Sequence, residues 1–183
     1  VEITEQTANA LFDETGSLFK GIVYGGFIAT KNGAKLIEFN ARFGDPESMN
    51  VLPILKTDFV DICEAIIKGN LDKIDIEFEN KATVCKYIVP DGYPTNPKKG
   101  EKIEIGKYPE GVNMYYSSVS EKNNEIYMSG SRAIAFVGIS DTISKAEKIA
   151  ASALQSVSGP VFYRDDIGTD KLIQKRIDMM KSL

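Results

Sequence analysis

The spacing of apolar residues changes along the first half of the chain, and the predicted element changes with it. Apolar positions three and four apart are typical of an amphipathic helix, whereas alternation is typical of a strand. On these patterns we expect helices at residues 2–16 and 58–70, and strands at 21–30 and 35–42. The stretch KNG (31–33) would join the strands into a hairpin. Pro46 cannot continue the second strand, because it has no backbone donor.

Short strand patterns dominate the second half, after a charged stretch at 71–81 that we interpret as a joint. The strand candidates are ATVCKYIVP, KIEIG, NMYYSSVS, EIYMSG and SRAIAFVGI. Helical patterns follow at 141–157 and in the closing TDKLIQKRIDMMKSL. Antiparallel strands followed by helices indicate an α+β fold. We therefore predict one domain over 1–75 and a second, α+β domain over 76–183.

Composition narrows the function classes. The 183 residues are 43% hydrophobic and 26% charged, with a formal net charge of -4 and acids and bases intermixed. A nucleic-acid partner is not expected, because no basic surface is indicated. A membrane is not expected either, since no apolar run approaches the roughly 20 residues of a spanning helix. Cys63 and Cys85 lie in apolar segments and are expected to be reduced thiols in a cytoplasmic protein.

Histidine is absent from the sequence. Nucleophiles activated by histidine, histidine-ligated metals and imidazole proton shuttles are therefore excluded within this chain. Any chemistry must use carboxylates, amides, lysine, arginine, tyrosine, hydroxyl groups or a hard metal ion.

Glu38, Asn40 and Arg42 would share one face of the strand predicted at 35–42. Same-face neighbours on a strand are about 6.5–7 Å apart. A solvated strand face is the simpler interpretation of this pattern. A carboxylate and an amide at this spacing can also bracket Mg²⁺, which prefers oxygen ligands, and an arginine beside them can hold a phosphoryl oxygen. The three residue types therefore suit a metal–nucleotide site.

The segment YGGFIATKNGAKLIEFNARFGDPES resembles the metal-binding hairpin of ATP-grasp enzymes, in which an E-x-N-x-R strand carries the magnesium ligands. The narrower RFGDPE resembles the phosphoribosylamine–glycine ligases. Further segments resemble that family in the same order: KTDFVDICEAIIKGNL, VPDGYPTNPKKGEKI, GSRAIAFVG with DTISKAEKIA, and YRDDIG. Two stretches depart from the family pattern, YYSS at 115–118 and Ser48-Met49-Asn50 after the D-P-E turn.

The resemblance implies that residues 1–75 are the last section of an ATP-grasp domain and that 76–183 are the family's C-terminal domain. The implied reaction joins glycine to 5-phosphoribosylamine with ATP, through a glycyl phosphate, in purine biosynthesis. The family's N-terminal portion, which supplies the nucleotide pocket, would be a further partner. The chain opens at Val1 in a helical pattern, which suggests a piece of a longer polypeptide, inactive alone.

The resemblance also implies roles for single residues. Glu38 and Asn40 would bind Mg²⁺ or Mn²⁺, and Arg42 would contact the transferred phosphoryl group. Asp45 and Glu47 would contact a substrate, and a turn aspartate and an exposed glutamate are the alternative interpretation.

Arg132, in SGSR, would also contact a substrate, and an ordinary surface arginine is the alternative.

Two other functions of the chain stay open at this point. One is a non-catalytic binding module that keeps the fold, and the other is a different ATP-grasp ligase or carboxylase.

Overall fold

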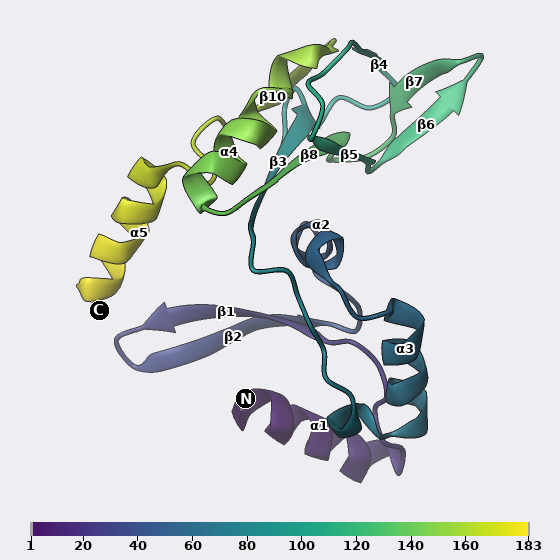
Figure 1. Cartoon of the computed structure of the whole chain (residues 1–183), viewed down its shortest axis with the longest axis vertical. Coiled ribbons are helices and arrows are strands. Elements are labelled where there is room, and N and C mark those ends of the chain that lie inside the picture. Colours follow the sequence, from purple (N-terminus) through teal and green to yellow (C-terminus); the bar gives the residue numbers. More distant parts are fainter. Residues whose placement is uncertain (1, 183) are drawn as a thin grey trace. The chain divides into compact units, whose positions relative to one another are not determined.

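The computed structural model describes residues 2–182, and Val1 and Leu183 lie outside this range. The chain forms two compact units (Figure 1). The first comprises the chain up to Glu79 and the residues from Asp178 onward, and the second runs from Asn80 to Ile177. Helices and antiparallel sheets occur together, as an α+β fold requires.

The first unit contains a hairpin and helices. In chain order its elements are α1 (Glu2–Thr15), β1 (Tyr24–Thr30), β2 (Gly33–Asn40), α2 (Glu47–Val51), the 3₁₀ turn η1 (Leu52–Ile54), α3 (Phe59–Lys68) and the 3₁₀ turn η2 (Leu71–Lys73). The segment after η2 returns to η1, where Phe78 and Leu55 form an isolated antiparallel bridge.

Capping residues explain where α3 begins and ends. The Asp58 side chain accepts a hydrogen bond of 2.8 Å from the backbone nitrogen of Val60, which satisfies one of the free donors at a helix start. Gly69 ends the helix with φ 70°, in the left-handed region that favours glycine. The helix expected over 58–70 is thus present as Phe59–Lys68, with Asp58 and Gly69 as its caps.

The apolar side of α1 is not covered. Leu11 and Phe12 are each 45% exposed, Ala8 is exposed and Ile3 is half-buried. Among the described residues of α1, none is buried. The helix is amphipathic as predicted, but nothing in the described part of its unit buries its apolar side.

The second unit is built from two four-stranded sheets with the orders β10–β3–β8–β5 and β6–β7–β4–β9. Every strand pair in them is antiparallel. The strands are β3 (Ala82–Pro90), β4 (Lys102–Ile105), β5 (Asn113–Tyr116), β6 (Val119–Lys122), β7 (Glu125–Met128), β8 (Ile134–Ser140), β9 (Val157–Ser158) and β10 (Val161–Tyr163). The helices are α4 (Ile143–Ala151), the 3₁₀ turn η3 (Leu154–Ser156) and α5 (Asp170–Lys181), of which the residues from Asp178 onward are assigned to the first unit.

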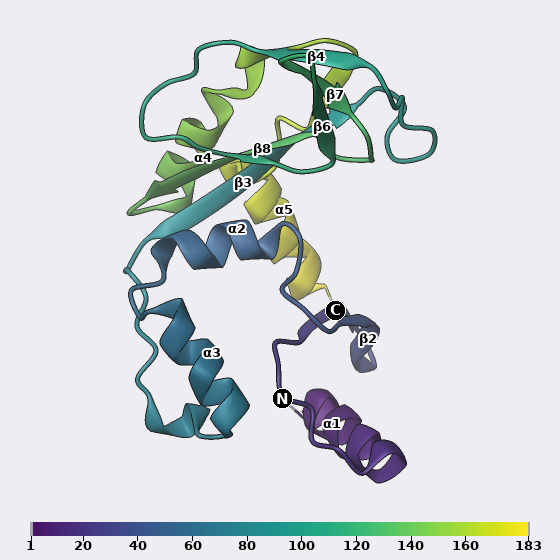
Figure 2. The same cartoon turned by 90° about the vertical axis from the view of Figure 1, so that its right-hand side faces the viewer.

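Helix α4 packs against β3 and β8, and the core of the second unit lies beside it (Figure 2). Ile88, Ile134 and Phe136 are fully buried there. Gly138 permits the close approach of α4, because a Cβ atom at this position would lie 2.7 Å from the backbone nitrogen of Ala150.

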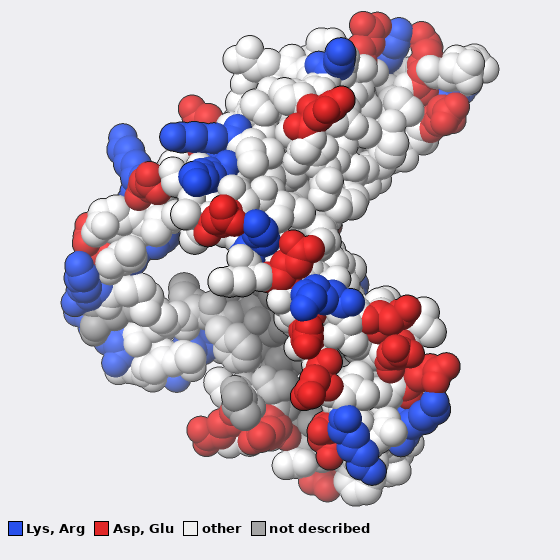
Figure 3. Space-filling model, viewed as in Figure 1, with Lys and Arg blue, Asp and Glu red and all other residues white. Residues whose placement is uncertain are grey.

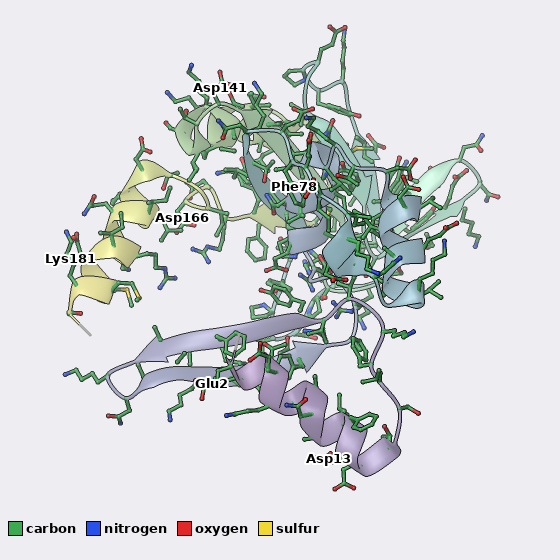
Figure 4. The ribbon with its side chains drawn as sticks, turned by 60° about the horizontal axis from the view of Figure 1, so that its bottom comes forward. Glu2, Asp13, Phe78, Asp141, Asp166 and Lys181 are labelled. Carbon is green, nitrogen blue, oxygen red and sulfur yellow. The ribbon has the colours of Figure 1, made fainter. Side chains whose placement is uncertain are left out.

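A buried lysine also holds this unit together. Lys86 of β3 has a fully buried side chain, and its Nζ lies 2.7 Å from Oε1 of Glu147 on α4. The same Nζ donates a 2.6 Å hydrogen bond to the carbonyl oxygen of Asp165. Lys86 therefore joins β3 to α4 and to the segment before α5. Figure 4 labels Asp166 in that segment and Asp141 just before α4.

Two predicted elements of the second unit are shortened or divided in the structure. The helix expected over 141–157 ends at Ala151, because the chain then turns through η3 so that Val157 can pair with Ile105 of β4. The strand expected over NMYYSSVS is two strands, β5 and β6, which pair with different neighbours. Tertiary pairing overrides local propensity in both places.

Candidate metal and nucleotide site on the β1–β2 hairpin

The hairpin positions the candidate site. Strands β1 and β2 pair antiparallel, with Gly26 opposite Glu38 and Tyr24 opposite Asn40. A β-bulge lies between Gly26 and Phe27, and bulges often redirect side chains next to functional sites. The hairpin is the long two-stranded ribbon of Figure 1.

Glu38 and Asn40 lie side by side. The Asn40 Nδ2 donates to Glu38 Oε1 over 3.1 Å, so the structure brings these two predicted residues together. Gly26 stands opposite Glu38, where a Cβ atom would come 3.6 Å from Glu38 Cγ. A side chain at residue 26 would therefore meet Glu38 at an ordinary van der Waals distance.

The donor chemistry of this pair fits a magnesium ion. Glu38 offers carboxylate oxygens, and Asn40 offers an amide oxygen once its side chain turns Oδ1 toward the ion. The described residues contain no group of three or more histidine, cysteine, aspartate or glutamate side chains that could hold a metal. A site with two protein ligands suits Mg²⁺, which usually keeps waters and substrate phosphates as its other ligands.

The other face of the hairpin is packed with aromatic rings. Phe27 and Phe39 meet edge to face, with centroids 6.1 Å apart. A Cβ atom at Gly25 would lie 3.0 Å from the Phe39 ring, which explains the glycine there by close packing. The hairpin therefore has one aromatic face and one polar face.

Arg42 lies beyond the strand, because β2 ends at Asn40 and not at residue 42 as predicted. Its Nη1 donates a 2.6 Å hydrogen bond to the carbonyl oxygen of Phe43, and the side chain is exposed. The Phe43 ring packs at 5.9 Å against Phe59 of α3. The chain bends at this point to make that contact, so Arg42 follows the site without continuing its strand face.

The turn after β2 returns a carboxylate to the hairpin. Asp45 and Pro46 are joined by a cis peptide bond, and Glu47 then opens α2. Glu47 Oε1 accepts a 2.8 Å hydrogen bond from the hydroxyl of Tyr24. This hydrogen bond raises the pKa of Tyr24, with smaller contributions from burial and from the charges of Glu47 and Glu38. The phenol therefore stays protonated near neutral pH and donates.

Tyr24 was missed by the sequence analysis. Its signal was the hairpin register, which places it opposite Asn40 and on the polar face. Arg132, by contrast, belongs to the second unit, where its guanidinium carbon lies 5.2 Å from the centroid of the Tyr87 ring.

Acidic and basic side chains both appear on the face drawn in Figure 3, with uncharged areas between them. Across the described residues, no helix is both long and apolar enough to cross a lipid bilayer.

Comparison with protein families identifies the chain. The family described as phosphoribosylglycinamide synthetase, ATP-grasp (A) domain, matches residues 1–48, and the C domain of the same synthetase matches residues 83–170. A phosphoribosylamine–glycine ligase of Methanocaldococcus jannaschii is 54% identical over the whole chain, and one of Methanosarcina acetivorans is 53% identical. The chain belongs to the phosphoribosylamine–glycine ligase family. It spans 41% of the length of each of these relatives.

Solved structures agree with this assignment. The crystal structure of phosphoribosylamine–glycine ligase from Thermotoga maritima matches 90% of this chain with a TM-score of 0.70 and 25% identity, over 42% of its own length. The biotin carboxylase domain of a 2-oxoglutarate carboxylase from Hydrogenobacter thermophilus matches 90% of the chain, and 37% of its own, with a TM-score of 0.58 and 21% identity. That second likeness concerns the fold alone. The predicted α+β fold with an ATP-grasp portion is thereby confirmed.

Proposed function

We propose that this chain is part of an ATP-dependent ligase that joins glycine to 5-phosphoribosylamine and forms glycinamide ribonucleotide, ADP and phosphate. The observation that carries the proposal is the 54% identity, over the full chain, to a phosphoribosylamine–glycine ligase. The Glu38–Asn40 pair supports it, since its oxygens suit a magnesium–nucleotide complex.

The reaction has two steps that need no histidine. A glycine carboxylate oxygen attacks the γ-phosphorus of ATP, the bond to the β-phosphate oxygen breaks, and ADP leaves. The amine nitrogen of 5-phosphoribosylamine then attacks the carbonyl carbon of glycyl phosphate, phosphate leaves, and the nitrogen loses a proton. In the first step the anionic carboxylate of glycine must approach the anionic γ-phosphate of ATP. Cations near the transferred phosphoryl group are therefore required.

We assign roles to the hairpin residues on this basis. Glu38 and Asn40 would hold Mg²⁺, or Mn²⁺ with the same oxygen ligands, and the ion supplies charge neutralisation at the phosphates. Arg42 would contact the transferred phosphoryl group, since a guanidinium forms paired hydrogen bonds to phosphate. Asp45 and Glu47 would contact a substrate.

For Arg132 we propose contact with a substrate phosphate.

We place the reaction in the cytoplasm, which agrees with two cysteines that form no disulfide with each other.

We further propose that the preceding portion of the enzyme completes the site. The first unit exposes large apolar side chains that a neighbouring part of the same enzyme would cover. They include Leu11, Phe12, Leu18, Phe19, Val23, Phe27, Ile28, Leu36 and Ile37, with exposures of 38% to 70%. Contiguous exposed apolar surface usually marks an interface.

Release of ADP tests the proposal. We expect ADP release that requires both glycine and 5-phosphoribosylamine when this chain is combined with the N-terminal portion of a relative, and none from either part alone. ADP release in the combined sample without dependence on both substrates would contradict the proposed reaction. Full turnover by this chain alone would contradict the need for a partner portion.

A further inference from the structure

The Glu47 carboxylate is fixed from two sides. Its Oε1 accepts the 2.8 Å hydrogen bond from the Tyr24 hydroxyl. Its Oε2 lies against Gly44, a buried residue, at the place where a Cβ atom would stand. That Cβ atom would also lie only 3.0 Å from the Tyr24 ring. Gly44 therefore has no room for a side chain while Glu47 and Tyr24 keep these positions.

One oxygen of this carboxylate remains available. Glu47 is half-buried, and the bond from Tyr24 is the one hydrogen bond that its carboxylate makes within the described residues. Oε2 therefore has an unused acceptor site next to the polar hairpin face. A partly buried carboxylate strongly favours a hydrogen-bond donor that is positively charged or has several N–H groups.

The surroundings favour a cationic or neutral nitrogen over an anion. Glu38 lies near enough to contribute to the raised pKa of Tyr24, so two carboxylates act on this region. The cation nearest in sequence, Arg42, directs Nη1 to the carbonyl oxygen of Phe43. Tyr24 itself only donates to Glu47 in this arrangement.

We propose that Tyr24 is a positioning residue, which holds the Glu47 carboxylate so that Oε2 accepts a hydrogen bond from the amine nitrogen of a substrate. This inference rests on the proposed function, which offers two nitrogen sources, the amino group of glycine and that of 5-phosphoribosylamine. The chemistry that Glu47 recognises is the same for both.

Kinetics of the complete enzyme, assembled from this chain and the N-terminal portion, test the inference. The variants are Tyr24→Phe, Glu47→Gln and the double variant, with Tyr116→Phe as the matched control, because Tyr116 is an exposed tyrosine of the second unit. We expect Tyr24→Phe to raise the KM of one amine substrate about tenfold, as loss of a hydrogen bond to a charged group would. The substrate affected identifies the source of the nitrogen. The KM for ATP and the magnesium dependence should stay unchanged, and Tyr116→Phe should match the unsubstituted enzyme.

The double variant separates positioning from a general structural role. If Tyr24 acts through Glu47, the KM of the double variant should be no higher than that of Glu47→Gln alone, because the effects of two residues in direct contact are not additive. Additive losses would overturn the inference, as would a fall in kcat with both amine KM values unchanged. A shift confined to the magnesium dependence would also overturn it.

A second variant covers a failure of Tyr24→Phe to fold. Gly44→Ala retains the Tyr24 hydroxyl but displaces the Glu47 carboxylate and crowds the Tyr24 ring, so it should raise the same KM. An unchanged KM in Gly44→Ala overturns the inference while the proposed function stands. If the unsubstituted enzyme shows no turnover that depends on both substrates, the proposed function fails and this inference fails with it.

Discussion

At the scale of single residues, the hydrogen bond between Glu38 and Asn40 is the central feature of the hairpin. A bound cation would take over the Glu38 oxygen that now accepts from the amide. Glu38 is exposed, so its carboxylate contributes little to folding. Function and stability should therefore separate at this position.

We predict that Glu38→Ala abolishes ATP turnover by the complete enzyme and leaves the urea midpoint of unfolding within error of the parent. The physical reason is the loss of a charged oxygen ligand for the ion. Glu121→Ala, at an exposed glutamate of β6, is the matched control and should keep its turnover. Near-normal turnover in Glu38→Ala would remove the metal assignment.

Asn40→Ala should act more mildly than the glutamate substitution. We predict that it raises the magnesium concentration needed for half-maximal rate, because an uncharged ligand is lost and a water can replace it. A magnesium titration of the initial rate measures this. A titration curve that coincides with that of the parent would count against Asn40 as a ligand.

Alternation along β2 was enough to predict that Glu38 and Asn40 share a face. It could not predict the contact of Tyr24 with Glu47, since that depends on the hairpin register and on the path of the turn through Asp45 and Pro46. Arg42 was assigned to the strand because nothing local marks its end. The packing of Phe43 on Phe59, which is a long-range contact, bends the chain there.

At the scale of elements, the ion pair of the buried Lys86 is another contact that the local sequence pattern could not predict. Lys86 lies in the apolar run ATVCKYIVP, and strand alternation alone gives it no partner. Its partners come from α4 and from the Asp165 carbonyl, which are more than 50 residues away in sequence. Only the packed fold can bring them to one point.

We predict that Lys86→Met lowers the free energy of unfolding by about 3 kcal/mol, because the Glu147 carboxylate, whose side chain is only 13% exposed, would lose its charged partner. Urea unfolding followed by circular dichroism measures the change. Lys81→Met is the control, since Lys81 and Asp141 form an exposed pair 2.6 Å apart and such pairs contribute about 1 kcal/mol or less. If both variants lost the same free energy of unfolding, burial of Lys86 would add nothing to the contribution of its ion pair.

At the scale of the whole molecule, the two units differ in how much they bury. The buried core residues of the second unit include Ile88, Met128 and Phe136, each fully buried, whereas α1, α2 and the hairpin of the first unit contain no buried residue. The α+β class could be predicted from the order of the patterns. The unequal burial of the two units could not be predicted, because the amphipathic pattern of residues 2–16 does not indicate what covers the apolar face of that helix.

We propose that the two units act as separate domains and predict that they exchange hydrogen at different rates. Amides of β3 and β8 should be protected far longer than those of β1 and β2, because core strands open only with the whole unit. Hydrogen exchange of the intact chain, read by mass spectrometry, measures this. Uniform protection across both hairpin and core strands would mean that the chain opens as a single unit.

The positions of the two cysteines give each unit its own chemical reporter. Cys63 is half-buried on α3, and Cys85 is buried on β3. A thiol-specific reagent should modify Cys63 first and should reach Cys85 only when the second unit opens. The order of modification would then record which half of the molecule loosens first, and a partner portion that protects Cys63 would reveal its own docking without any engineered label.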